Sequence, residues 1–190
     1  DRSRLTDVDS RLVQEDYITI LGNVEPRKGH LELALAINYL NKVASKKVHL
    51  VIVGSPIHRA KGILDSITTL LGDQVIFTGY VDDETKDHIL QFGRCHAYIS
   101  KFEGFGLPFV ESIINDIPNI VLNATSMSEL IPNSQFCVDS LEPKILAHRL
   151  LDNFDVKPSE ILNSSELTDF NKHFSWERVS KDYMDVYQNV

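Results

Sequence analysis

Short runs of β-branched and aliphatic residues alternate with amphipathic stretches along the chain, and this alternation restricts the fold more than any other feature. The runs are nearly continuous in Val, Ile and Leu, which is typical of parallel strands that are covered on both faces. On this basis we predict strands at residues 17–21, 48–53, 75–78, 97–100, 119–122 and 135–138.

Between and after these runs, apolar residues recur at helical spacing. In the stretch 30–43, for example, Leu33, Ile37 and Leu40 share one helical face. Asp82 and Asp83 are candidate N-caps, and Pro108 suits a first helical turn. We predict helices at residues 30–43, 60–71, 83–92, 107–115, 126–131, 142–154, 159–170 and 176–188.

The order of these elements predicts an α/β fold, a Rossmann-like doubly wound parallel sheet with helices on both faces. We expect this domain at residues 17–190, preceded by a linker remnant at residues 1–16. Ligands of such sheets bind outside the carboxyl ends of the strands. The residues that follow each strand are therefore the candidate site residues.

The composition argues against several classes of function. The formal net charge is −8 and the basic residues are scattered, so we expect no nucleic-acid partner. No apolar run reaches the roughly 18 residues that a membrane span needs. Cys95 and Cys137 lack ligand spacing, which predicts two buried thiols, no metal site and a reducing cytoplasm. The polar start without an initiator Met suggests an excised fragment.

The segment EGFGLPFVE, residues 103–111, carries the strongest functional signal. Its two glycines allow close approach of the backbone to a ligand, and the predicted helix behind them would offer free N–H groups and a partial positive charge. Glu103 would precede that helix and Glu111 would lie about one turn inside it. Two carboxylates beside such a pocket suit a phosphorylated, polyhydroxylated ligand. On spacing alone, a Glu103 that only ends a strand and a solvated Glu111 explain the pattern as well.

This segment resembles the E-x7-E motif of the retaining GT-B glycosyltransferases, the glycosyl transferases group 1 family. Six segments resemble that family in the same order: LGNVEPRKG (21–29), VHLVIVG (48–54), VIFTGYV (75–81), HAYISKFEGFGLP (96–108), IPNIVLNATSMSEL (117–130) and FSWERVSKDYMDVY (174–187). The resemblance spans residues 17–187. It implies the C-terminal half of a GT-B fold, with the N-terminal acceptor-binding half missing from this chain.

The resemblance also implies an activity. The whole protein would transfer a hexose from a UDP- or GDP-linked sugar to a glycan or lipid-linked acceptor, with no obligatory metal or other cofactor. This half alone is expected to bind the donor weakly and to turn over nothing. We expect a cytoplasmic protein, at or near the inner face of the membrane, with any membrane contact made through the missing half.

The resemblance further implies roles for individual residues. Glu111 would bind the ribose hydroxyls, and Glu103 would lie near the hydroxyls of the donor sugar. Lys28 would neutralise the leaving diphosphate. Together with Arg27, Glu103 and Lys28 form the predicted catalytic group. The other predicted substrate-binding positions are the backbone at Gly104, Phe105, Gly106 and Leu107, the turn at Gly22 and Asn23, and Tyr80 and Val81 beside the base.

The chain departs from the family pattern at three places. Asn23 stands where the family often has Arg, and Arg27 either supplies that charge or is an exposed loop residue. Ile99 replaces the usual Pro before the motif's serine. The usual Gly after the motif helix is replaced by Asn115 or Asp116, which puts the geometry of that turn in question.

Other interpretations stay open. A non-catalytic nucleotide-sugar-binding module, or a GT-B nucleotide-sugar epimerase, would share the fold. We expect His30 to be a surface residue at a helix start, while His58 and Arg59 face either the donor or solvent. In the family the helix at residues 176–188 crosses toward the other half, so part of its apolar stripe is expected to be exposed here.

Overall fold

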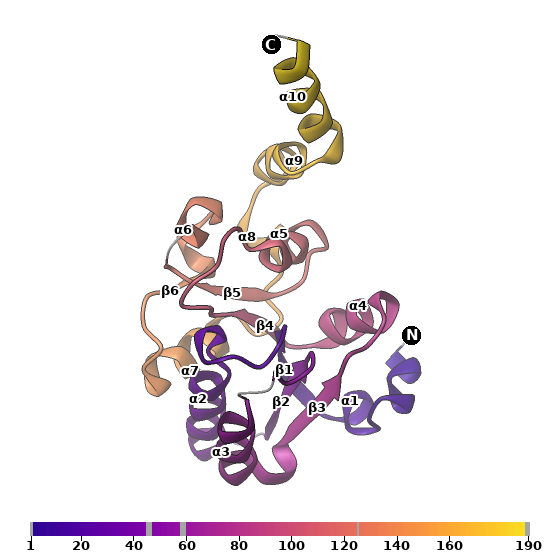
Figure 1. The fold of residues 1–190 in the computed structure, drawn as a ribbon. Helices are drawn as coiled ribbons and strands as arrows, with labels where there is room; N and C mark the ends of the chain where they lie inside the picture. Colours follow the sequence, from indigo (N-terminus) through magenta and orange to yellow (C-terminus); the bar gives the residue numbers. More distant parts are fainter. Residues whose placement is uncertain (1, 45–46, 58–59, 125, 189–190) are drawn as a thin grey trace.

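The computed structural model describes residues 2–44, 47–57, 60–124 and 126–188, which form a parallel sheet flanked by helices (Figure 1). Within these ranges the six strands lie in the order β3-β2-β1-β4-β5-β6. Their bounds are β1 Asp16–Leu21, β2 Val48–Val53, β3 Val75–Gly79, β4 Cys95–Tyr98, β5 Asn119–Leu122 and β6 Cys137–Val138. This is the strand order of a doubly wound sheet, so the predicted fold class is confirmed.

Helices cover both faces of the sheet (Figure 1). One face carries α2 (His30–Val43), α3 (Lys61–Leu71) and α7 (Pro143–Asp152). The other carries α4 (Asp83–Phe92) and α5 (Leu107–Ile114). Successive residues of a strand point to opposite faces of the sheet. Ile18 and Ile20 therefore lie in the core under α2, whereas Tyr17 lies in the core under α4. The remaining helical segments are η1 Arg2–Asp7, α1 Arg11–Gln14, η2 Pro26–Lys28, η3 Gly72–Gln74, α6 Met127–Leu130, η4 Ser134–Phe136, α8 Pro158–Ile161, α9 Ser164–His173 and α10 Trp176–Gln188.

Three predicted elements differ from the structure. The predicted helix 159–170 is two helices, because Asn163 caps a new one: its side chain accepts hydrogen bonds from the N–H groups of Ser165 and Glu166. The predicted strand 135–138 is strand only in its last two residues, since Asn133 caps the short helix η4 ahead of it. The strand predicted at 97–100 is β4, which lies two residues earlier.

Residues that the sequence analysis places in a linker pack against the domain. Leu5 and Leu12 are fully buried, and they share a core with Val51, Ile76 and Ile89. Helices η1 and α1 therefore complete the cover of the sheet on the α4 side (Figure 1).

Helix α10 extends beyond the rest of the domain, at the top of Figure 1. It buries no residue, and its apolar side chains are exposed: Trp176 85%, Tyr183 62%, Met184 55%, Val186 60% and Tyr187 73%. The expected exposure of this stripe is thus confirmed. No described helix is long and apolar enough to cross a membrane.

Three glycines join the loops at the carboxyl ends of β1, β2 and β3. The N–H of Gly22 donates to the Val53 carbonyl at 2.8 Å, and that of Gly54 donates to the Gly79 carbonyl at 3.0 Å. A Cβ on Gly54 would lie 2.5 Å from the carbonyl oxygen of Gly22, so no larger residue fits there. The edge of the sheet where ligands are expected is therefore a set of tightly connected loops.

The turn after α5 is built without glycine. Asp116 adopts φ 55°, the left-handed conformation that short polar side chains tolerate best after glycine. Its carboxylate accepts hydrogen bonds from the N–H and the hydroxyl of Ser159, at 2.8 and 2.9 Å. Asp116 therefore takes the place of the usual glycine and links this turn to α8.

We expect Gly54→Ala to lower the free energy of unfolding by about 2–4 kcal/mol, measured by urea denaturation. The cause is the contact with the Gly22 carbonyl together with the positive φ of 142° at this position.

The matched control is Gly62→Ala in the first turn of α3, where nothing lies within 4 Å of the added methyl group. Alanine is the better helix former, so this variant is expected to be unchanged or more stable by up to about 1 kcal/mol. Equal stability of the two variants would contradict the close contact of the loops.

Candidate functional site

The candidate site lies where the strand order reverses, between β1 and β4. The loops after these two strands are in direct contact. The N–H of Lys101 donates to the Arg27 carbonyl at 2.7 Å. Gly29, at φ 82°, lies so close to Ile99 that a Cβ would come 2.9 Å from the Ile99 carbonyl oxygen. The chain thus brings segments 22–29 and 99–106 together as one surface.

Glu103 is the centre of this surface. Its Oε1 accepts a hydrogen bond from Ser100 Oγ at 2.9 Å and pairs with Lys28 Nζ and Arg27 Nη1, each at 2.8 Å. The side chain is only 14% exposed. Burial by itself would raise the pKa of this carboxyl, but the contacts with Lys28, Ser100 and Arg27 outweigh it and hold the pKa below its usual range.

Arg27 is fixed from two sides. Its Nε pairs with Glu25 Oε2 at 2.8 Å, and its Nη1 donates to the Phe102 carbonyl at 2.8 Å and forms the ion pair with Glu103. The side chain is 39% exposed, so it is neither buried nor a freely moving loop residue. The structure therefore places the Arg27 guanidinium beside Glu103.

Lys28 lies against the turn at Gly22, where a Cβ would come 3.2 Å from Nζ. Glycine at position 22 is thus needed both for its φ of 116° and for the space that Lys28 occupies. Asn23, the next residue, is exposed.

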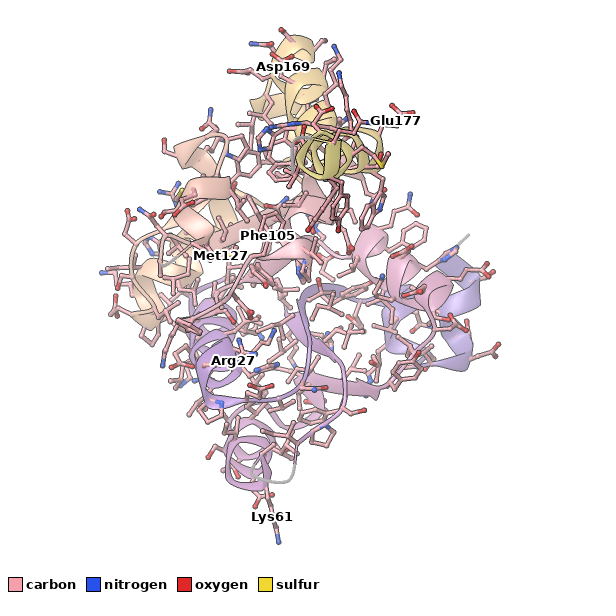
Figure 2. The ribbon with its side chains drawn as sticks, turned by 45° about the horizontal axis from the view of Figure 1, so that its top comes forward. Arg27, Lys61, Phe105, Met127, Asp169 and Glu177 are labelled. Carbon is pink, nitrogen blue, oxygen red and sulfur yellow. The ribbon has the colours of Figure 1, made fainter. Side chains whose placement is uncertain are left out.

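The N-terminus of α5 forms the other side of the site. Gly106 is the buried N-cap residue at φ 103°, and a Cβ there would meet the sulfur of Met127 at 2.3 Å. In Figure 2, Phe105 and Met127 lie next to each other above the loop that carries Arg27. Among the described residues, no hydrogen-bond acceptor is found for the backbone N–H groups of Gly104, Phe105, Gly106 and Leu107. These groups and the helix dipole are available to an anion or a hydroxyl.

The other predicted residues lie outside the hydrogen bonds and ion pairs of Glu103. Glu111 is exposed in the second turn of α5, and Tyr80 is 86% exposed just after β3. Val81 is half-buried and packs on the core that contains Leu5 and Leu12. No hydrogen bond or ion pair within the described chain joins these three side chains to Glu103.

Sequence reasoning missed three contributors to the site. Ser100 donates a hydrogen bond to the Glu103 carboxylate. Ser126 donates to the backbone carbonyl of Glu103 at 2.8 Å, and Glu25 holds Arg27. A serine three residues before a loop glutamate is a local signal that could have been used, whereas the contact of Ser126 spans 23 residues and leaves no local pattern.

The prediction of a surface position for His30 is wrong, because this side chain is 1% exposed. The loop after β1 folds back over it, with the backbones of Gly22 and Glu25 near the ring. Neither ring nitrogen makes a hydrogen bond of normal geometry. Burial lowers the pKa of His30 to about 4, and the nearby charge of Lys28 acts in the same direction. The ring is therefore neutral at neutral pH and packs behind the loop of Arg27 and Lys28.

Two further features complete the site description. The described residues contain no group of three or more His, Cys, Asp or Glu side chains that could hold a metal ion. Cys95 and Cys137 are buried free thiols, as predicted. His58 and Arg59 lie outside the described residues.

Comparison with known proteins identifies the class of this domain. The chain has the fold of the C-terminal domain of the group 1 glycosyltransferase LpcC from Francisella tularensis, with a TM-score of 0.64, 19% identity and coverage of 84% of this chain and 85% of that one. It also superposes on HepE from Anabaena, in a crystal structure with UDP and glucose, with a TM-score of 0.78, 15% identity and coverage of 100% and 53%.

The family model for glycosyl transferases group 1 matches residues 5–157, so the chain belongs to this family. Among curated proteins it is similar to the O-antigen chain mannosyltransferase B of Escherichia coli, with 27% identity over 185 residues. That match covers 94% of this chain but only 47% of the relative. The chain therefore spans about half the length of the curated relative that it matches.

The buried His30 predicts a pH dependence of stability. The pKa of His30 is about 4 in the folded protein and about 6.5 in the unfolded chain. Between pH 6.5 and pH 4 the unfolded chain therefore binds more protons, and the free energy of unfolding falls as the pH drops through this range. When the pH is lowered from 7 to 5, we expect the free energy of unfolding of His30→Phe to fall by about 2 kcal/mol less than that of the wild type, measured by urea denaturation at each pH. Parallel pH profiles of the two proteins would contradict the neutral, buried state of His30.

Proposed function

We propose that this chain is the donor-binding half of a retaining glycosyltransferase that transfers a hexose from a nucleotide diphosphate sugar to a glycan or lipid-linked acceptor. The observation that carries the proposal is the pairing of Lys28 and Arg27 with Glu103 at the point where the strand order reverses. Two cations, a carboxylate and the open N-terminus of α5 meet there, and together they match a diphosphate linked to a sugar.

In this proposal the positive charge serves the leaving group. When the bond from the sugar to the diphosphate breaks, negative charge develops on the phosphate oxygens. Lys28, Arg27 and the N–H groups at the start of α5 stabilise that charge, and they are held in place before the reaction begins. The charge comes from the chain itself, so the proposal requires no metal or other cofactor.

The two glutamates of the E-x7-E spacing have separate roles in this proposal. Glu103 accepts hydrogen bonds from the hydroxyls of the donor sugar, and its lowered pKa keeps it ionised for this purpose. Glu111, exposed on α5, accepts them from the ribose. The exposed ring of Tyr80, after β3, borders the base.

The donor and the partner half follow from the relatives. HepE was crystallised with UDP and glucose, and the curated relative is a mannosyltransferase, so UDP- and GDP-linked hexoses are the donors to test. We further propose that the exposed stripe of α10 packs against the acceptor-binding half, and that the enzyme works in the cytoplasm. The isolated chain is then a binding domain without turnover.

The test is titration calorimetry of the chain with UDP, GDP and one sugar derivative of each. We expect one nucleotide to bind selectively and Lys28→Ala or Glu111→Ala to weaken it at least about tenfold, because each removes a charge-assisted contact. Lys42→Ala is the matched control: this exposed lysine lies in the last turn of α2, and its loss should leave the affinity unchanged.

Binding of neither nucleotide at millimolar concentration, by this chain and by a full-length protein that includes the other half, would overturn the proposal. Equal weakening by the Lys28 and Lys42 variants would show a general charge effect in place of a site.

A further inference from the structure

Glu25 is a charged residue of the site to which the proposed function gives no role. It precedes the short helix η2 in extended conformation, and its backbone carbonyl accepts the N–H of Lys28 at 3.1 Å. Its carboxylate is half-buried and pairs with Arg27 Nε at 2.8 Å. We propose that Glu25 is a positioning residue that holds the guanidinium of Arg27 toward the diphosphate, an inference that rests on the proposed function.

The geometry of the guanidinium carries this inference. Nε is taken by Glu25, and Nη1 is taken by the Phe102 carbonyl and by Glu103. Within the described chain no hydrogen bond from Nη2 is found, so this group can donate to a ligand. Because the guanidinium is planar, fixing Nε and Nη1 also fixes the direction of Nη2.

The length and exposure of the Arg27 side chain explain why it needs a partner that fixes its orientation. Arg27 reaches the site through a long side chain that is 39% exposed. Ordering such a side chain costs conformational entropy, and an ion pair made before binding reduces that cost. The loop backbone is held as well, because the Arg27 carbonyl accepts the N–H of Lys101.

Charge alone predicts the opposite effect for Glu25. A carboxylate beside a diphosphate repels it, so removing the negative charge would tighten binding if Glu25 acted only through its charge. A positioning role predicts that the same change weakens binding. The direction of the effect therefore distinguishes the two.

The experiment measures the affinity of the chain for nucleoside diphosphates and monophosphates, with UDP, UMP, GDP and GMP as probes. We expect Glu25→Gln and Glu25→Asp to weaken the preferred diphosphate by about threefold to tenfold, with a change below about twofold for the monophosphate. Asp keeps the charge but shortens the reach, so it separates position from charge. In an Arg27→Ala background, Glu25→Gln should have no further effect, because Glu25 acts only through Arg27.

The matched control is Glu32→Gln, which breaks the ion pair between Glu32 and Lys101 beside the same two loops. We expect it to leave the diphosphate affinity within about twofold of the wild type. The unfolding temperature of each variant shows that it is folded.

Three results would overturn the inference. Tighter diphosphate binding by Glu25→Gln would show that Glu25 acts on the diphosphate through charge repulsion. Equal weakening of mono- and diphosphate binding would show a general structural role of Glu25. Additive losses in the double variant would show that Glu25 does not act through Arg27. If the wild-type chain binds none of the four probes, the proposed function fails and this inference fails with it.

Discussion

The site depends on one carboxylate that gathers charges from two loops. Glu103 Oε1 accepts a hydrogen bond from Ser100 of its own loop. The same oxygen forms ion pairs with Lys28 and Arg27 of the loop after β1. A half-buried carboxylate with one hydroxyl donor and two cations beside it stays ionised, and the two cations stay in place because their partner does. Replacing Glu103 would therefore remove one hydrogen-bond acceptor and would also displace Lys28 and Arg27.

The fold makes this meeting possible. Strands β1 and β4 are neighbours in the sheet although 73 residues, from Gly22 to Arg94, lie between them in the sequence. Their loops then meet through the Lys101–Arg27 backbone bond and through the space that glycine leaves at Gly29. On the other side, Met127 and Ser126 support the loop that carries Glu103. The two loops of the site are thus held by segments distant in sequence as well as by local contacts.

Local patterns predicted the elements well where one periodicity dominates. Helices α2, α4 and α10 have the predicted bounds, because apolar spacing defines them and Asp82 caps the start of α4. The split between α8 and α9 was missed, since a capping box at Asn163 overrides a continuous helical pattern. The burial of His30 and the role of Ser126 were missed for another reason. Both depend on loops that fold over them from elsewhere in the chain, and no local spacing records that.

The most direct test of the central claim is an NMR titration of the ¹⁵N-labelled chain with UDP or GDP, whichever binds. We predict that the largest amide shifts fall in two segments, residues 22–29 and residues 103–107, which are far apart in sequence but adjacent at the site. Shifts concentrated at the amino ends of the strands, around Arg94 and Asp155, would contradict this site, because neither Lys28 nor Glu103 lies there.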